Sequence, residues 1–215
     1  MPESGAATSV TENASARKHR AILEAAEEMF LRGGYLGTNM DELAALSQVS
    51  KQTVYKHFGS KEALFVELVT TMTDAAGDRV HNEVPDPANA SEIPAYLQAY
   101  AERQLAVVMT PRLLQLRRLV IGEVARFPDL ARALYESGPK RATSALAAVF
   151  ARLDARGLLD VDDPDAAASQ FNWIIMGEPI NQAMLLGDAA IPGIAARRRH
   201  AAGAVSVFLA AYGRD

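Results

Sequence analysis

The stretch Thr38–Phe65 constrains the fold most, because its 28 residues carry three separate helix-start signals. Thr38, Ser50 and Ser60 are of the types that cap helix N-termini with a side-chain oxygen. Gly59, just before the third start, is typical of a helix end. The spacing predicts one helix that starts at Thr38 and stops at Ser47-Gln48-Val49, a second over Lys51–His57, and a third from Ser60 to about His81.

Two short helices joined by a tight turn form a helix-turn-helix, whose second helix enters the DNA major groove. No acidic residue lies between Glu42 and Glu62, so nothing in this segment repels a phosphate backbone. The start of the second helix carries side chains that hydrogen-bond bases, and those after it reach phosphates. The alternative is a solvated polar face on an ordinary three-helix unit. The candidate DNA-binding residues are Thr38, Ser50, Lys51, Gln52, Thr53, Tyr55, Lys56, His57 and Lys61.

This segment resembles the DNA-binding domain of the tetracycline-repressor (TetR) family of bacterial regulators, over about the first seventy residues. The family usually has Gly in the turn where this chain has Gln48, and a left-handed Gln costs roughly 1 kcal/mol. The stretch LVIGEVARFPDLARALYESGP is similar to the AefR-like C-terminal domain of a subgroup of this family. The matching residues in the first part are Gly34-Tyr35, Thr38, Asp41, Leu43-Ala44, the run from Val49 to Phe58, and Lys61 to Leu64.

The net charge of −4 and the isoelectric point near 5.6 do not favour a nucleic-acid partner for the chain as a whole. DNA binding requires only a local positive footprint. The cluster Arg17-Lys18-His19-Arg20 and the lysines of the helix-turn-helix supply one. The cluster fits a minor-groove arm and a solvated first helical turn equally well. The chain has no Cys, which excludes disulfides and thiolate metal sites, and no apolar run long enough for a membrane helix, so we expect a cytoplasmic protein.

The rest of the chain predicts helices only, and the expected fold is all-α. Residues 1–14 are expected to be a disordered tail and 15–62 a helix-turn-helix DNA-binding domain. Residues 63–215 are expected to form a larger helical domain for ligand binding and dimerisation. The first helix is predicted over Ser15–Arg32, ended by Gly33-Gly34. Later helix starts are predicted at Ser91, Pro111, Pro128, Arg141, Asp163-Pro164 and Pro192, with a boundary at Gly138-Pro139.

Aromatic, thioether and amide side chains on these later helices suit a pocket for an apolar or aromatic molecule. Plain core packing is the alternative for each of them. Pro179 removes a backbone hydrogen bond and should kink its helix, and Glu178 beside it would anchor a ligand or pair with Arg117 or Arg118. The candidate ligand-binding residues are Tyr96, Tyr100, Gln104, Met109, Phe127, Phe150, Trp173, Met176 and Glu178.

The last two predicted helices bear on assembly. Phe171–Met176 is apolar on nearly every side of a helix, which suits burial on two faces. A monomer core is the alternative to a dimer interface. The TetR resemblance implies a homodimer formed through these two helices as a four-helix bundle.

No catalytic or cofactor-binding motif was found, so we expect neither enzyme activity nor a cofactor or metal. The predicted function is a homodimeric repressor that binds a near-palindromic operator in double-stranded DNA and is released by an unknown small-molecule effector. The alternatives are an architectural or cell-division factor that binds DNA without ligand control, and an enzyme that uses the C-terminal cavity.

Overall fold

The structure is a computed structural model that describes residues 13–81 and 85–214. These residues form helices and no β-strand, apart from one isolated bridge between Leu159 and Gly213, which confirms the predicted all-α class. No helix among them is long and apolar enough to cross a membrane. The chain divides between Leu68 and Val69 into two compact units. The predicted domain boundary at residues 62 and 63 stays a prediction.

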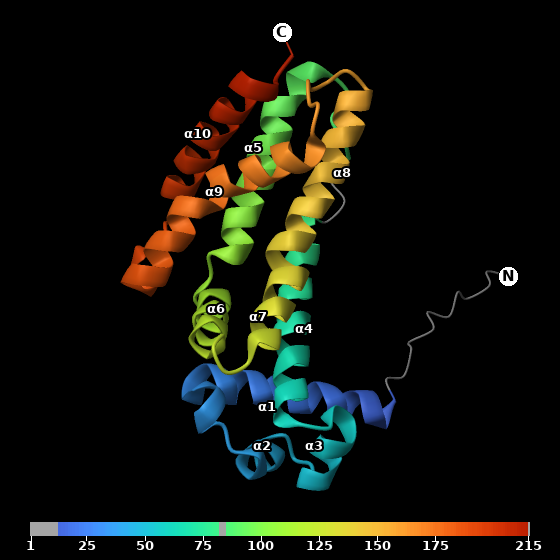
Figure 1. Cartoon of the computed structure of the whole chain (residues 1–215), viewed down its shortest axis with the longest axis vertical. Helices are drawn as coiled ribbons and strands as arrows, with labels where there is room; N and C mark the ends of the chain where they lie inside the picture. The colour runs from blue at the N-terminus through green and yellow to red at the C-terminus, as the bar shows by residue number, and fades with distance from the viewer. Residues whose placement is uncertain (1–12, 82–84, 215) are drawn as a thin grey trace, which may run out of the picture. The chain divides into compact units, whose positions relative to one another are not determined.

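The first unit contains α1 (Ala14–Gly37), α2 (Met40–Leu46), α3 (Lys51–Phe58) and the beginning of α4 (Lys61–His81), as labelled in Figure 1. Its core is aromatic at the centre. The ring of Phe30 lies 4.6 Å from that of Phe65, and Tyr35 lies 5.4 Å from Phe65. Leu43 and Val54 are fully buried beside them. Tyr35, Leu43, Val54 and Phe58 are all buried.

The beginning and the end of α1 both differ from the prediction. The helix begins at Ala14, capped by Asn13, so these two residues do not belong to a disordered tail; residues 1–12 lie outside the described part. The helical segment also continues past Gly33 to Gly37, although Gly34 itself leaves helical geometry at φ 74° and ψ 173°. A glycine adopts this conformation without steric cost, so the chain bends there and resumes helical turns.

The cap of α2 lies one residue later than predicted. Asn39 is the N-cap, and its side-chain oxygen accepts a hydrogen bond of 2.8 Å from the backbone N–H of Asp41. Thr38 is buried, and its hydroxyl donates to the carbonyl of Gly34 at 2.9 Å. The threonine hydroxyl therefore closes the end of α1 and is not available to cap α2.

The turn between α2 and α3 matches the helix-turn-helix prediction. Ser50 caps α3 by accepting a hydrogen bond from the N–H of Thr53, and Gly59 ends the helix at φ 75°. The hydroxyl of Ser47, which is buried, donates to the carbonyl of Leu43 at 2.8 Å. Gln48 takes the left-handed conformation, at φ 56°, in the position where the resemblance leads one to expect glycine.

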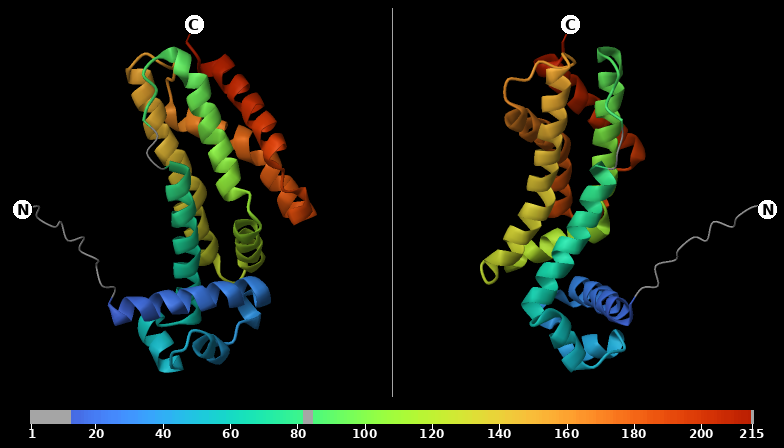
Figure 2. Two further views of the ribbon diagram at one scale, coloured as in Figure 1. Left: turned by 180° about the vertical axis from the view of Figure 1, so that it is seen from behind. Right: turned by 90° about the vertical axis from the view of Figure 1, so that its right-hand side faces the viewer.

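The second unit begins within α4 and contains all the later helices. Figure 2 shows α5 and α10 side by side, and α8 packs along α9. The rings of Phe150 and Phe171 lie 4.9 and 4.6 Å from that of Phe208, so α8, α9 and α10 share one aromatic cluster. The helices are α5 (Ile93–Val108), α6 (Pro111–Glu123), α7 (Pro128–Tyr135), α8 (Arg141–Ala155), α9 (Pro164–Leu186) and α10 (Ile194–Tyr212), with short η1 (Ala90–Glu92), η2 (Glu136–Lys140) and η3 (Asp188–Ala190).

Three predicted boundaries in this unit are wrong. Asn89 rather than Ser91 provides the cap after the Pro-rich break, because its side chain accepts the N–H of Ser91. Pro139 does not interrupt the helical turns, since the wider π-helical turn η2 accommodates it between α7 and α8. The last helix begins at Ile194, after Gly193, and not at Pro192.

Pro179 lies inside α9, which continues through it. Proline has no N–H, so the carbonyl of Ile175 loses its helical donor. The Nε2 atom of His200, on α10, lies 2.8 Å from that carbonyl and donates to it. The missing bond predicted from the sequence is thus replaced by a bond between two helices.

Substitution of Gln48, the left-handed residue of the turn between α2 and α3, tests whether that turn is strained. We expect Gln48→Gly to raise the free energy of unfolding by about 0.5 kcal/mol, because relief of a strain of about 1 kcal/mol is partly offset by the greater freedom of an unfolded glycine. The β-branched change Gln48→Val should lower it by about 1 kcal/mol or more. Urea unfolding of the three proteins measures this order; equal stabilities would show that the turn is not strained.

Candidate functional site

Helix α3 presents a polar face to solvent because its opposite face is buried. Val54 and Phe58 pack inward, whereas Lys51, Gln52, Tyr55 and Lys56 are exposed, with Tyr55 at 40%. These four positions are spaced so that they lie on one side of a helix. The structure therefore brings four of the nine predicted DNA-binding residues together on one exposed surface, which we call the α3 face.

Two of the predicted base-contacting side chains already have partners within the unit. The Nζ atom of Lys51 donates to a carboxylate oxygen of Asp41 at 3.0 Å, and this bond raises the pKa of Lys51. The hydroxyls of Ser50 and Thr53 are 2.8 Å apart. Because Lys51 and Asp41 are both exposed, their ion pair is weak and exchanges readily for another anion.

A concave surface lies beside the α3 face, between the start of α1 and α3. It is lined by Lys18 and Lys56, with no carboxylate among the described residues that line it, and this charge suits a phosphate group. Lys18 thus joins the predicted set from the basic cluster of α1. The remaining lining residues are Ala14, Ser15, Thr53 and His57.

His19 and Arg20 of the same cluster are occupied within the unit. The ring of His19 stacks on Phe58 at 4.7 Å, and its Nε2 lies 2.7 Å from a carboxylate oxygen of Glu67. Arg20 lies 3.7 Å from Glu24 one turn later. Of the described cluster, Lys18 is the member that lines the concave surface.

Two further predicted residues have structural roles. Thr38 is only 4% exposed, and its hydroxyl is bonded to Gly34. The Nζ atom of Lys61 donates to the carbonyl of Thr38 at 2.6 Å and lies 4.9 Å from the centre of the Tyr35 ring. Thr38 thus faces away from the α3 face, and Lys61 is anchored to the loop between α1 and α2.

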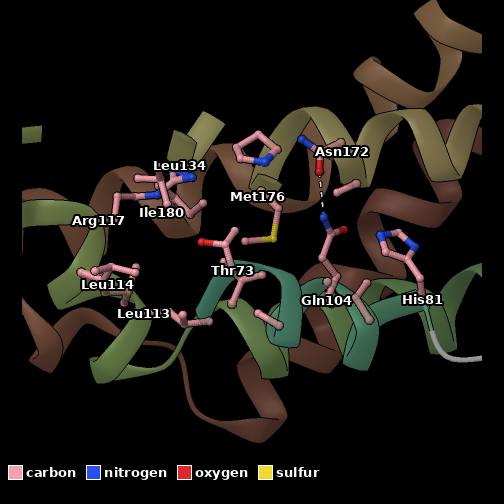
Figure 3. Close-up of a pocket in the computed structure, with 18 of the residues that line it drawn as sticks. Thr73, His81, Gln104, Leu113, Leu114, Arg117, Leu134, Asn172, Met176 and Ile180 are labelled. Carbon is pink, nitrogen blue, oxygen red and sulfur yellow. Dashed lines mark hydrogen bonds between the residues drawn. The ribbon is translucent and has the colours of Figure 1, made fainter. Parts of the chain in front are cut away.

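The second unit contains a cavity of about 120 Å³ between helices α4, α5, α6 and α9 (Figure 3). One water requires roughly 10–15 Å³ on this scale, so the cavity admits a molecule of about ten non-hydrogen atoms. Three predicted ligand-binding residues, Gln104, Trp173 and Met176, line it.

The other six predicted ligand-binding residues do not line the cavity. Tyr100, Met109 and Phe150 are core residues, each at most 5% exposed. Glu178 is exposed and accepts a hydrogen bond from Gln182, so it neither anchors a ligand there nor pairs with Arg117 or Arg118. Tyr96 and Phe127 are half-buried outside the cavity.

Sequence reasoning missed four polar residues of the cavity, namely Thr73, His81, Arg117 and Asn172. The side-chain amide of Gln104 donates to the Oδ1 atom of Asn172 at 2.7 Å. Burial lowers the pKa of His81, with smaller contributions from Arg141 and Arg103, so its ring is neutral near pH 7. A polar residue among apolar neighbours at helical spacing was the available signal, and it applies to Asn172 within FNWIIM.

Comparisons with known proteins agree with a helix-turn-helix unit followed by a larger helical unit. Residues 22–68 match the family described as bacterial regulatory proteins of the tetR family, and residues 95–214 match the AefR-like transcriptional repressor C-terminal domain. Among solved structures, a TetR-family transcriptional regulator of Mesorhizobium loti is 38% identical and covers 94% of this chain and 100% of its own, with a TM-score of 0.82. The flavonoid-responsive regulator FrrA is 31% identical over 92% of this chain and 97% of its own, with a TM-score of 0.74.

Curated relatives match over a shorter stretch. The transcriptional regulator QacR of Staphylococcus aureus is 44% identical over 48 residues, which are 22% of this chain and 26% of QacR. The matched part of the chain thus spans about a quarter of that relative's length. With family matches to both units, one of them over more than half of the chain, the protein belongs to the TetR family of bacterial transcriptional regulators.

Proposed function

We propose that this DNA-binding regulator is a dimeric repressor that binds a near-palindromic operator and leaves it when a small molecule fills the cavity of the second unit. The observation that supports the proposal is the α3 face, where side chains predicted to read bases and to bind phosphates share one exposed surface. The C-terminal match to an AefR-like repressor domain supports repression rather than activation.

On DNA, the N-terminal end of α3 is placed to read bases. Gln52 is exposed, and its amide suits bidentate recognition of adenine, while Lys51 suits guanine once it leaves Asp41. Tyr55, Lys56, His57 and Lys18 would bind phosphates on either side. Thr38 is not included in these contacts because its side chain faces inward.

Ligand control would act through α4. Thr73 and His81 of this helix line the cavity, and the same helix begins at Lys61, soon after α3 ends at Phe58. A ligand that displaces the later turns of α4 would therefore reorient α3. A coupling free energy of about 1–3 kcal/mol between the two sites suffices for a useful switch. The name of the relative FrrA, a flavonoid-responsive regulator, supports control of this kind.

The dimer would form through α9 and α10. Large apolar side chains are exposed on both helices: Trp173 at 65% and Leu185 at 75% on α9, and Ile194 at 65% and Val207 at 59% on α10. A dimer of this kind would cover these exposed apolar side chains. A second copy would also double the number of base pairs read, which a single α3 needs for selective binding.

The division of roles on α3 gives a first prediction. With the operator selected by the purified protein from random DNA, Gln52→Ala should relax the preference at one base pair per half-site, a loss of about 1–3 kcal/mol in discrimination. Lys56→Ala should weaken binding to all sequences alike and reduce the salt slope by about 1 per half-site. Fluorescence anisotropy with operator and single-base variants measures both; an equal loss on every sequence from Gln52→Ala would refute the division.

The ion pair of Lys51 gives a second prediction. We expect Asp41→Asn to strengthen operator binding by roughly twofold to fivefold at low salt, because Lys51 no longer exchanges a carboxylate for DNA. Glu42→Gln is the matched control, since it removes the same charge from the same turn without touching Lys51. An equal gain in both variants, measured by anisotropy, would show that only net charge matters.

A further inference from the structure

Among the described residues that line the cavity of the second unit, one side chain is cationic and none is anionic. Arg117 of α6 lines it, and no Asp or Glu occurs among the lining residues. Its neighbour Arg118 shows the usual arrangement, with its guanidinium 2.8 Å from Asp188 and bonded to the carbonyl of Ala183. No such partner for Arg117 occurs in the part of the chain that the structure describes.

An unpaired guanidinium in a half-buried position is costly. Burial lowers the pKa of Arg117, but a guanidinium keeps its proton in proteins and so remains charged in the cavity. A charge in an apolar site is stabilised by an opposite charge with good hydrogen bonds. The planar fork of the guanidinium matches a carboxylate through two parallel hydrogen bonds.

The far end of the cavity contains a second set of polar atoms without partners. The Oε1 atom of Gln104 and the Nε2 atom of His81 are both buried, and neither has a hydrogen-bond partner among the described residues. Because burial lowers the pKa of His81, none of the described lining residues at this end is expected to be charged near pH 7. A ligand hydroxyl suits it, because a hydroxyl donates one hydrogen bond and accepts others.

The two ends are separated along the helices that form the walls. Figure 3 shows Arg117 beside Ile180 at one end, Gln104 with Asn172 at the other, and Thr73 and Met176 between them. Asn172 and Ile180 are eight residues apart on α9, which corresponds to about 12 Å. Most of the other lining residues are apolar and include Val80, Val108, Leu113, Leu114, Leu134 and Met176.

We propose that the effector is an amphipathic organic anion. Its carboxylate binds Arg117, its apolar or aromatic body fills the middle of the cavity, and a hydroxyl at its other end meets Gln104 and His81. This inference rests on the proposed function at one point only: the proposed function identifies the cavity as the effector site. The charge of Arg117 selects the anion, and the apolar walls exclude small hydrophilic anions such as phosphate.

Calorimetric titration of the full-length protein, without DNA, tests the proposal. The probes are para-hydroxyphenylpropanoate and its primary amide, which has nearly the same shape and no charge. We expect the wild-type protein to bind the propanoate with a dissociation constant below about 1 mM and about tenfold or more tighter than the amide. Arg117→Gln should remove this preference. Arg118→Gln, the control on the same helix, should keep it.

Equal binding of the two probes by the wild-type protein, or no propanoate binding at millimolar concentration, would overturn the proposal. A preference that survives Arg117→Gln would overturn it as well. The unliganded Arg117→Gln protein should melt at or above the wild-type temperature, because it loses a charge without a partner; a lower melting temperature would show that Arg117 is structural. Binding that depends on Arg117 without release of DNA would uphold this inference and contradict ligand control.

Discussion

The burial of Val54 and Phe58 determines which side of α3 faces solvent, and the DNA-binding role depends on that orientation. Ser50 and Gly59 limit the helix to eight residues, so its inward and outward faces cannot exchange without loss of both caps. Truncating Phe58 to Ala in this small core would cost about 3 kcal/mol or more, a large share of the stability of a unit of this size. The α3 face is therefore held by packing beneath it and not by contacts among its own polar side chains.

The second unit depends on buried polar bonds as well as on its aromatic core. The Gln104–Asn172 pair joins α5 to α9, and the bond from His200 to Ile175 joins α10 to α9 at the point where Pro179 leaves a carbonyl free. Both bonds involve α9, which is also the helix that carries exposed Trp173 and Leu185. The proposed ligand cavity and the proposed dimer interface thus share one helix. A ligand that alters the packing of α9 would affect the dimer as well as α4.

Local features could be predicted from the sequence because each depends on a few neighbouring residues. The caps at Ser50 and Asp163, the helix end at Gly59 and the start of α7 at Pro128 are of this kind. Thr38 and Ser91 show the limit. Each lies within two residues of an asparagine that caps instead, and for Thr38 a bond to Gly34, four residues earlier, decides the outcome.

The cavity could not be predicted in the same way, because its lining comes from helices far apart in the sequence. Aromatic residues such as Tyr100 and Phe150 suited a pocket by residue type but are packed in the core. Arg117 and His81 are polar residues, and only tertiary contacts determine which side of their helices faces the cavity. The sequence therefore predicted that these helices enclose a cavity better than it predicted which residues line that cavity.

The central claim is that two copies of this chain, joined through α9 and α10, bind one operator. Sedimentation velocity of a labelled operator with saturating protein measures the number of chains per DNA directly. The account predicts two chains for the wild-type protein and for Ile121→Asp, which alters an exposed apolar residue on α6. Val207→Asp, on α10, should leave a monomer with much weaker binding, since a charge would be buried in the interface. A single wild-type chain that saturates the operator, or a Val207→Asp protein that still binds as a pair, would contradict the account.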